Sequence, residues 1–344
     1  MLHPRYAFRG TDARMSRLLV LREAEPMLRT CGVATMELLT QYGVEVVFGI
    51  PGVHTLEFCR GLGDDSPLRH IRARHEQGAG FMADGYARAT GRPGVALVIS
   101  GPGVTNAATA LGQSYADSIP VLLISAEPPR ASLGKGFGVL HEITEQKAVT
   151  APLTAFSATA LMPQDVPELI RQAFVLFASE RPRPVHISIP TDVLEMPVTE
   201  HWQAVASPTR PTADKASIAA AAAMLRQSER PLLMLGRGAI GASPAATSLA
   251  ERLDAAFMPS VAGKGVVSDY HPLSVGATGG RARVHQLIAH ADVILAVGTE
   301  ISETDTFVER LEINGKLIRI DLDSRKLNDL YPADIGIVAD AGVL

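Results

Sequence analysis

The sequence predicts the α/β fold class, with two doubly wound domains that are each built on a mainly parallel sheet. Short apolar runs of strand type alternate with helical segments along both halves of the chain, which is typical of βαβ units. A proline-rich stretch without periodicity separates the two halves. The length of 344 residues also exceeds the roughly 250–300 residues at which a single core usually stops growing.

Composition and charge exclude several other classes of protein. With 47% hydrophobic and 20% charged residues, the chain has the balance of a globular protein rather than a disordered one. The net charge is −4 and both signs are mixed along the chain, so we expect no nucleic-acid partner. No apolar run reaches the roughly 18–20 residues that cross a bilayer, so we expect no membrane association. The two cysteines, Cys31 and Cys59, form no metal motif and no disulfide framework, which favours reduced thiols in the cytoplasm.

The first domain is assigned to residues 30–190. Expected strands such as 95–100 and 121–126 are short and apolar, as is typical of parallel strands that are buried on both faces. Right-handed crossovers between them place helices on both faces of the sheet. We expect strands at 44–50, 70–74, 95–100, 121–126 and 185–189, and helices at 53–61, 76–90, 104–116 and 164–179. The arginine-rich residues 1–29 are expected to form a disordered extension outside this domain.

The second domain is assigned to residues 214–344 and follows a linker over 191–213 that contains several prolines. Ser243 is the expected N-cap of one of its helices, with Pro244 at the first helical position. We expect strands at 231–235, 256–261, 292–298 and 317–322, and helices at 216–227 and 243–254.

Three loops of the first domain should meet at one edge of its sheet. Pro51 and Gly52, then His75 and Glu76, then the Gly101–Pro102–Gly103 turn each follow a predicted strand. Ligands of open α/β sheets collect at the carboxyl ends of the strands, so the sequence indicates one crevice that contains one acid, Glu76. An alternative remains open, because glycine and proline are ordinary turn residues and a glutamate in a first helical turn compensates the helix dipole.

The residues of these loops carry a resemblance to a known family. The matching segments occur in order and with matching spacing: Phe48-Gly49-Ile50-Pro51-Gly52, His75-Glu76-Gln77-Gly78-Ala79, Ser100-Gly101-Pro102-Gly103, Thr105-Asn106 and Asp117-Ser118-Ile119-Pro120. Together they resemble the pyrimidine-binding domain of thiamine diphosphate enzymes, in the branch of acetolactate synthases and 2-oxo acid decarboxylases. The resemblance runs from about residue 27 to residue 190. It continues more weakly to the end, where it implies a Rossmann-like central domain.

The resemblance implies a role for each of these residues. Glu76 would be the catalytic residue, because in this family a glutamate hydrogen-bonds the N1′ atom of the aminopyrimidine ring and so activates the cofactor. Residues beside the ring would come from both flanking loops: Ile50, Pro51, Gly52, Ile99, Gly101, Pro102, Gly103 and Asn106.

The substrate side of the crevice matches the family less closely. Where the family often has Phe-Gln-Glu, this chain has Leu140, His141 and Glu142 with a slightly longer spacing. His141, Glu142 and Gln113 are therefore candidates for substrate contact, while a loop histidine without a task and surface positions are the alternatives.

The metal site of the family is not found in the sequence. Its members hold the diphosphate through Mg²⁺ with a Gly-Asp-Gly motif in a third domain, and that string does not occur here. We therefore predict no metal ligands in this chain, with Mg²⁺ supplied through a missing or partner domain, and no activity of the chain alone. Three hypotheses stay open: a portion of a larger enzyme, one subunit of a split enzyme that forms a homo-oligomer or binds a partner chain, or a non-enzymatic remnant.

A second glycine motif lies in the predicted central domain. Residues 236–241, Gly-Arg-Gly-Ala-Ile-Gly, follow a predicted strand and fit the dinucleotide-binding pattern. An NAD site also needs an acid at the end of the next strand, whereas Asp254 precedes that strand. We therefore do not expect NAD. FAD is bound by some members of the family and is compatible with the motif, but it is not expected either.

The substrate class follows from the resemblance. The first loop, residues 50–57, and the segment around His141 look most like those of 5-guanidino-2-oxopentanoate (2-ketoarginine) decarboxylases. A guanidinium group favours a carboxylate partner, which Glu142 or Glu145 could supply. The predicted function is non-oxidative decarboxylation of a small 2-oxo acid, and an acetolactate synthase-type carboligase is the alternative.

Overall fold

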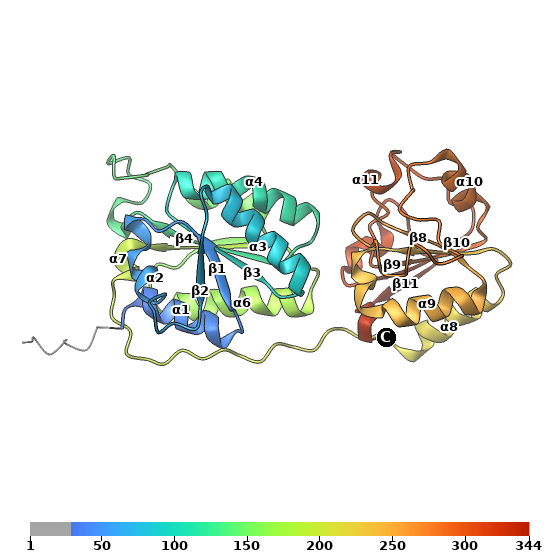
Figure 1. The fold of residues 1–344 in the computed structure, drawn as a ribbon, viewed down its shortest axis with the longest axis horizontal. Helices are drawn as coiled ribbons and strands as arrows, with labels where there is room; N and C mark the ends of the chain where they lie inside the picture. The colour runs from blue at the N-terminus through green and yellow to red at the C-terminus, as the bar shows by residue number, and fades with distance from the viewer. Residues whose placement is uncertain (1–28, 344) are drawn as a thin grey trace, which may run out of the picture.

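The computed structural model describes residues 29–343, which form two domains joined by an extended segment (Figure 1). The predicted disordered extension lies outside the described residues, apart from Arg29. In each domain, helices cover both faces of a parallel sheet, so the predicted pair of doubly wound α/β domains is confirmed. Within residues 29–343, no helix combines the length and the apolar character needed to cross a membrane.

The first domain is built on a six-stranded sheet with the order β2-β1-β3-β4-β6-β5. All neighbouring strands in it run parallel. The strands are β1 (Val46–Gly49), β2 (Arg69–Arg72), β3 (Gly94–Val98), β4 (Val121–Glu127), β5 (Phe156–Thr159) and β6 (Val185–Pro190). The chain passes from β1 to β2 on one side and then crosses to β3 on the other side. The carboxyl ends of β1 and β3 therefore flank the topological switch point, where ligands of such sheets bind.

Two apolar layers hold the helices of this domain on its sheet. Helices α1 and α6 cover one face and α3 and α4 cover the other (Figure 1). Successive side chains of a strand point to opposite faces of the sheet. Val47 therefore packs with α1 and α6, and Phe48 packs with α3 and α4. The helices are α1 (Cys31–Gln41), α2 (Leu56–Arg60), α3 (Glu76–Thr90), α4 (Pro102–Ala116), α5 (Gln146–Thr150), α6 (Asp165–Ser179) and α7 (Thr191–Leu194), with 3₁₀ turns η2 (Val53–Thr55), η3 (Arg130–Ser132) and η4 (Ala151–Leu153).

The second domain is built on a five-stranded parallel sheet with the order β11-β10-β9-β7-β8. Its strands are β7 (Pro231–Leu235), β8 (Ala256–Pro259), β9 (Val293–Val297), β10 (Lys316–Asp321) and β11 (Ile335–Val338). Its helices are α8 (Lys215–Arg226), α9 (Ser243–Leu253), α10 (Ala282–His290) and α11 (Glu303–Thr306), with 3₁₀ turns η5 (Arg237–Ala242), η6 (Ser324–Asn328) and η7 (Ala341–Val343). Helix α9 begins at Ser243, so its N-cap is Ala242 and not the predicted Ser243.

The segment between the domains is shorter than the predicted linker. Val198 and Trp202 are buried in the core of the first domain, and Pro197 pairs with Thr30 in an antiparallel bridge. These contacts extend the first domain to about residue 202. Residues 203–214 contain no helix or strand and connect the two domains.

Candidate active site

Glu76 is the first residue of α3, directly after β2 and its short connecting loop. His75 is the N-cap, and its Nδ1 atom accepts a hydrogen bond from the Gln77 backbone N–H at 3.1 Å. The Glu76 side chain is half-buried, and its Oε2 atom accepts a hydrogen bond from Asn106 Nδ2 at 2.9 Å. Its other oxygen accepts no hydrogen bond from any residue between 29 and 343. One carboxylate oxygen thus remains free for a ligand.

Close packing of two helices brings Glu76 and Asn106 together. One turn further along each helix, Gly80 lies against Ala110, and a Cβ at Gly80 would be only 2.6 Å from the Ala110 Cβ. The absence of a side chain at Gly80 therefore lets α3 and α4 approach closely. The acid and the amide that orients it consequently come from neighbouring helices with a fixed spacing.

The loop after β1 and the loop after β3 both pack against the side chain of Ile99. A Cβ at Gly52 would be 2.6 Å from Ile99 Cγ2, and a Cβ at Gly103 would be 2.9 Å from Ile99 Cγ1. The Gly52 turn is fixed by Thr55, whose Oγ1 accepts from the Gly52 N–H at 3.0 Å. The structure thus brings the loop after β1 against the loop after β3, at the switch point. The predicted ring-contacting residues lie on these loops and on the first turns of α4: Ile50, Pro51, Gly52, Ile99, Gly101, Pro102, Gly103 and Asn106.

Gly101 is held by a residue that the sequence did not single out. Its φ angle is +55°, and its N–H donates to Gln146 Oε1 at 2.8 Å. Gln146 is fully buried, and its Nε2 donates to Ser125 Oγ at 3.0 Å and to the Ala126 carbonyl at 2.9 Å. A chain of buried polar groups therefore supports the loop from behind.

This chain of polar groups ends at His186. Ser125 Oγ lies 2.8 Å from His186 Nε2, and the Nδ1 atom lies 2.7 Å from Thr150 Oγ1 and 2.9 Å from Ser157 Oγ. His186 has no exposed surface, and burial lowers its pKa to about 3. The imidazole is therefore neutral at ordinary pH and acts as a structural hydrogen-bonding group.

The predicted substrate residues lie in different places. The His141 carbonyl packs against Gly101, which puts His141 at the crevice. The Glu142 carboxylate accepts hydrogen bonds from the N–H groups of Gly136, Gly138 and Val139 at 2.9, 2.7 and 3.2 Å. It therefore stabilises the loop to which it belongs. Gln113 lies 11 residues along α4 from its first residue, about 16 Å at 1.5 Å per residue, and donates to Asp117 at 2.8 Å. The structure does not bring Gln113 to the crevice.

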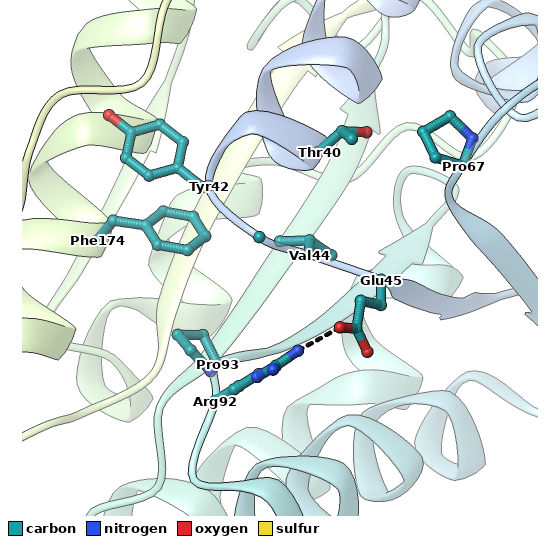
Figure 2. Close-up of a pocket in the computed structure, with 9 residues that line it drawn as sticks. Thr40, Tyr42, Val44, Glu45, Pro67, Arg92, Pro93 and Phe174 are labelled. Atoms are coloured by element: carbon teal, nitrogen blue, oxygen red, sulfur yellow. Dashed lines mark hydrogen bonds and ion pairs between the residues drawn. The ribbon is translucent and has the colours of Figure 1, made fainter.

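A separate hollow of about 500 Å³ lies at the opposite edge of the same sheet (Figure 2). Its lining residues Glu45, Pro67 and Pro93 precede β1, β2 and β3, so it opens at the amino ends of the strands. Glu45 pairs there with Arg92. Glu76 does not line this hollow, which is therefore separate from the crevice.

A larger cavity of about 1250 Å³ lies between the two domains and includes the second glycine motif. A Cβ at Gly236 would be 2.0 Å from the Gly298 carbonyl oxygen, so this glycine serves the packing of the β7 loop on the β9 loop. The residues that follow form a 3₁₀ turn, and Asp254 caps α9 at the amino end of β8. Glu76 does not line this cavity either.

Comparison with known proteins identifies the chain. Residues 29–149 match the N-terminal TPP binding domain of thiamine pyrophosphate enzymes, and residues 218–344 match the central domain of the same enzymes. The chain belongs to the thiamine pyrophosphate enzyme family. Within this family it is 55% identical over 314 residues to a probable 2-ketoarginine decarboxylase of Pseudomonas aeruginosa, a match that covers 91% of this chain and 56% of that protein. The resemblance stated from the sequence is confirmed.

Other thiamine pyrophosphate enzymes are less similar. A probable acetolactate synthase large subunit of Methanocaldococcus jannaschii is 34% identical, over 90% of this chain and 54% of that protein. A solved structure from Mycobacterium smegmatis, described as thiamin diphosphate-dependent, superposes with a TM-score of 0.81 at 25% identity, over 92% of this chain and 61% of that one. The chain thus spans about half the length of the curated relatives that it matches.

The crevice fits the aminopyrimidine part of the family's cofactor. A flat ring with a hydrogen-bonding nitrogen needs an acid with a free oxygen and an apolar surface nearby. Glu76 keeps one oxygen free, and Ile99 lies against Gly52 and Gly103 of the two loops beside it. Among residues 29–343, no three His, Cys, Asp or Glu side chains gather in a way that could hold a metal ion.

Proposed function

We propose that this chain supplies the aminopyrimidine-activating half of a thiamine diphosphate site for the non-oxidative decarboxylation of a 2-oxo acid. The observation that carries the proposal is the half-buried Glu76, which is oriented by Asn106 and flanked by two loops at the switch point of the sheet. The match to the N-terminal TPP binding domain over residues 29–149 supports the same site.

The chemistry divides between the cofactor and the chain. When bound, thiamine diphosphate supplies the electron sink that the reaction requires. Glu76 would hold or release a proton at its free oxygen, next to the ring nitrogen, and Asn106 would keep the carboxylate in position. The glycine loops would keep water from the ring, because they pack tightly on Ile99.

The remaining parts of the site would come from outside the residues described here. We propose that Mg²⁺ and the diphosphate are held by the rest of a longer protein, by a second copy in a homo-oligomer or by a partner chain. A cytoplasmic location, consistent with two unpaired cysteines, belongs to the same proposal.

The sequence identities to the relatives favour a decarboxylase over a carboligase as the function of this chain. The probable 2-ketoarginine decarboxylase is 55% identical, whereas two acetolactate synthases are 34% and 33% identical. We therefore propose 5-guanidino-2-oxopentanoate as the substrate. Glu145 is the better partner for its guanidinium group, because Glu145 is exposed directly before the loop-supporting Gln146, while the carboxylate of Glu142 is occupied by three backbone N–H groups.

The test is a Glu76→Gln substitution in an assembled enzyme. The chain is mixed with the remaining part of the Pseudomonas aeruginosa relative, thiamine diphosphate and Mg²⁺, and CO₂ release from 5-guanidino-2-oxopentanoate is measured. We expect the substitution to lower the turnover number by at least about 10²-fold, the usual contribution of a positioned proton-transfer group. Glu229→Gln, at an exposed turn of the central domain, is the matched control and should leave the rate unchanged.

Three outcomes would contradict the proposal. Equal rates for Glu76→Gln and the wild type would remove Glu76 from the mechanism. Turnover of pyruvate to acetolactate without release of an aldehyde would indicate the carboligase. Calorimetry that detects no thiamine diphosphate binding, either by the chain alone or by the mixture, would indicate a protein that only associates with other chains.

A further inference from the structure

A single side chain, Gln146, holds the turn at which α4 begins. Gly101 is the N-cap of α4, and its carbonyl accepts hydrogen bonds from the N–H groups of Val104 and Thr105, both at 3.0 Å. The Gly101 N–H donates to Gln146 Oε1 at 2.8 Å and to no other residue between 29 and 343. Because glycine is conformationally permissive, an outside contact is needed to select one conformation. Gln146 therefore determines where α4 starts.

The amide group of Gln146 has only one orientation that satisfies its partners. A backbone N–H can only donate a hydrogen bond, and a backbone carbonyl can only accept one. The amide lies between one of each, because its Oε1 faces the Gly101 N–H and its Nε2 donates to the Ala126 carbonyl at 2.9 Å. A half-turn of the amide would place donor against donor and acceptor against acceptor. Gln146 is only 2% exposed, so water cannot replace the lost bonds.

The same reasoning locates the ring proton of His186. Gln146 Nε2 also donates to Ser125 Oγ at 3.0 Å, so the hydroxyl proton of Ser125 points to its other partner, His186 Nε2, at 2.8 Å. Burial lowers the pKa of His186 to about 3, so the imidazole is neutral and carries one ring proton. Since Nε2 accepts, that proton lies on Nδ1. It is shared with Thr150 Oγ1 at 2.7 Å and Ser157 Oγ at 2.9 Å.

In the other direction, the Gly101 turn determines the position of Glu76. Asn106 lies on α4, about one and a half turns after Gly101. Its Nδ2 donates to Glu76 Oε2 at 2.9 Å, while the other carboxylate oxygen accepts no hydrogen bond within residues 29–343. A shift in the start of α4 therefore moves Asn106 and turns the carboxylate with it.

We propose that Gln146 is a positioning residue for the thiamine diphosphate site, held from behind by Ser125 and His186 and acting on Glu76 through the start of α4. The catalytic part of this assignment rests on the proposed function, because it takes the role of Glu76 from there. The hydrogen bonds between the imidazole and Gly101 have one set of donors and acceptors, so the turn has one position before any ligand arrives. A site that is ordered in advance loses less free energy when its ligand binds.

The first arm of the test uses the chain alone, without cofactor or turnover. Hydrogen exchange followed by NMR measures the protection of the Gly101 amide. We expect this amide to exchange about tenfold faster in Gln146→Met, which keeps the length of the side chain but removes its amide, because one hydrogen bond is lost. The side-chain amide resonances of Asn106 should shift in the same variant, although Asn106 lies on a different helix. The nitrogen chemical shifts of His186 should show a protonated Nδ1 and an unprotonated Nε2.

The second arm uses the assembled enzyme. Gln146→Met should weaken thiamine diphosphate binding and lower the turnover number, each about tenfold, while the KM for the 2-oxo acid stays unchanged. Gln203→Met is the matched control, because Gln203 is exposed in the connecting segment and its side chain forms no hydrogen bond within residues 29–343. The control should behave as the wild type does in both arms.

Gln146→Glu separates positioning from a simple loss of stability. Burial raises the pKa of the introduced carboxyl group, and its protonated form donates one hydrogen bond and accepts another, much as the amide does. Its turnover number, relative to that of Gln146→Met at the same pH, should therefore rise as the pH falls. A protein that is merely less stable would not recover activity in acid.

Three results would overturn the proposal. Equal exchange of the Gly101 amide in Gln146→Met and the wild type would show that Gln146 does not hold the turn. Unchanged Asn106 resonances together with unchanged turnover would show that the turn does not act on Glu76. A proton on His186 Nε2 would reverse the inferred direction of the hydrogen bonds. If Glu76→Gln shows that the proposed function is wrong, the exchange and resonance measurements still decide whether Gln146 holds the acid in place.

Discussion

The histidines of the first domain lie in contrasting surroundings, and burial decides what each one can do. His186 has no exposed surface, bonds three hydroxyl groups and stays neutral. His54 is only half-buried and faces a second imidazole at the crevice. The same residue type thus supports the site from behind in one place and borders it in the other.

His186 should make the protein sensitive to acid. Its folded pKa of about 3 is below the ordinary value of 6.5, so the unfolded state binds the proton more readily. The associated stability is complete above about pH 6.5 and is lost as the pH falls from there towards 3. His54 and His70 have lowered pKa values and act in the same direction. We expect the free energy of unfolding from urea titrations to decrease steadily from pH 7 to pH 5, before most carboxylates titrate.

The variant His186→Gln isolates this contribution. It should be less stable than the wild type at pH 7, because Ser125, Thr150 and Ser157 lose a buried partner. Its stability should also change less between pH 7 and pH 5. An unchanged slope in the variant would assign the acid sensitivity to other groups.

The sequence revealed some site residues and not others, for a physical reason. Glu76 and Pro51 stand in short motifs after predicted strands, so local spacing marks them. Gln146, Ser125 and His186 come from a short helix and two strands, and only the parallel pairing of β4 with β6 brings them together. No periodicity of the sequence identifies such a network.

At the scale of elements, the turn between β3 and α4 is the most constrained part of the crevice. Gly101 has a φ of +55°, and a Cβ there would be 2.2 Å from the His141 carbonyl oxygen. Conformation and space both require glycine at this position. The loop after β3 and the His141 loop are therefore fitted to each other.

Gly101→Ala should disturb this turn. We expect a loss of about 1–3 kcal/mol of stability, the usual cost of a strained backbone position, together with weaker thiamine diphosphate binding. Gly85→Ala is the matched control, because Gly85 lies in α3 with no neighbouring atom within 4 Å of the added Cβ. That control should be neutral or slightly stabilising, by up to about 1 kcal/mol. Thermal denaturation and calorimetry check both, and equal behaviour of the two variants would contradict the prediction.

The strands that the sequence marks most clearly are those with continuous apolar runs. The strands β3 and β4 lie in the middle of the sheet, are buried along their length and were found. The strands β5 and β11 were missed: both are half-exposed edge strands, and β11 contains Gly336, although the exposed edge strand β2 was found. Edge strands need fewer apolar residues, so their sequences resemble loops.

At the scale of the whole molecule, few polar contacts couple the two domains. Arg181 pairs with Glu300 at 2.7 Å, and Arg210 of the connecting segment pairs with Asp340. Burial alone would raise the pKa of Glu300, but Arg181 and Lys326 hold it below its usual range. These pairs are partly exposed to water, and such pairs contribute about 0–1 kcal/mol each. The two domains should therefore be largely independent in stability.

The position of Trp202 gives this independence an optical signature. It is the single tryptophan of the sequence, and it is buried against the first domain just before the connecting segment. Its fluorescence emission should shift to longer wavelength only when that domain opens, while far-ultraviolet circular dichroism records the helices of both domains. In urea, the two signals should follow different curves if either domain is the weaker one, and a coincident single transition would indicate tight coupling. One native indole thus makes the chain its own fluorescent reporter, with no label attached.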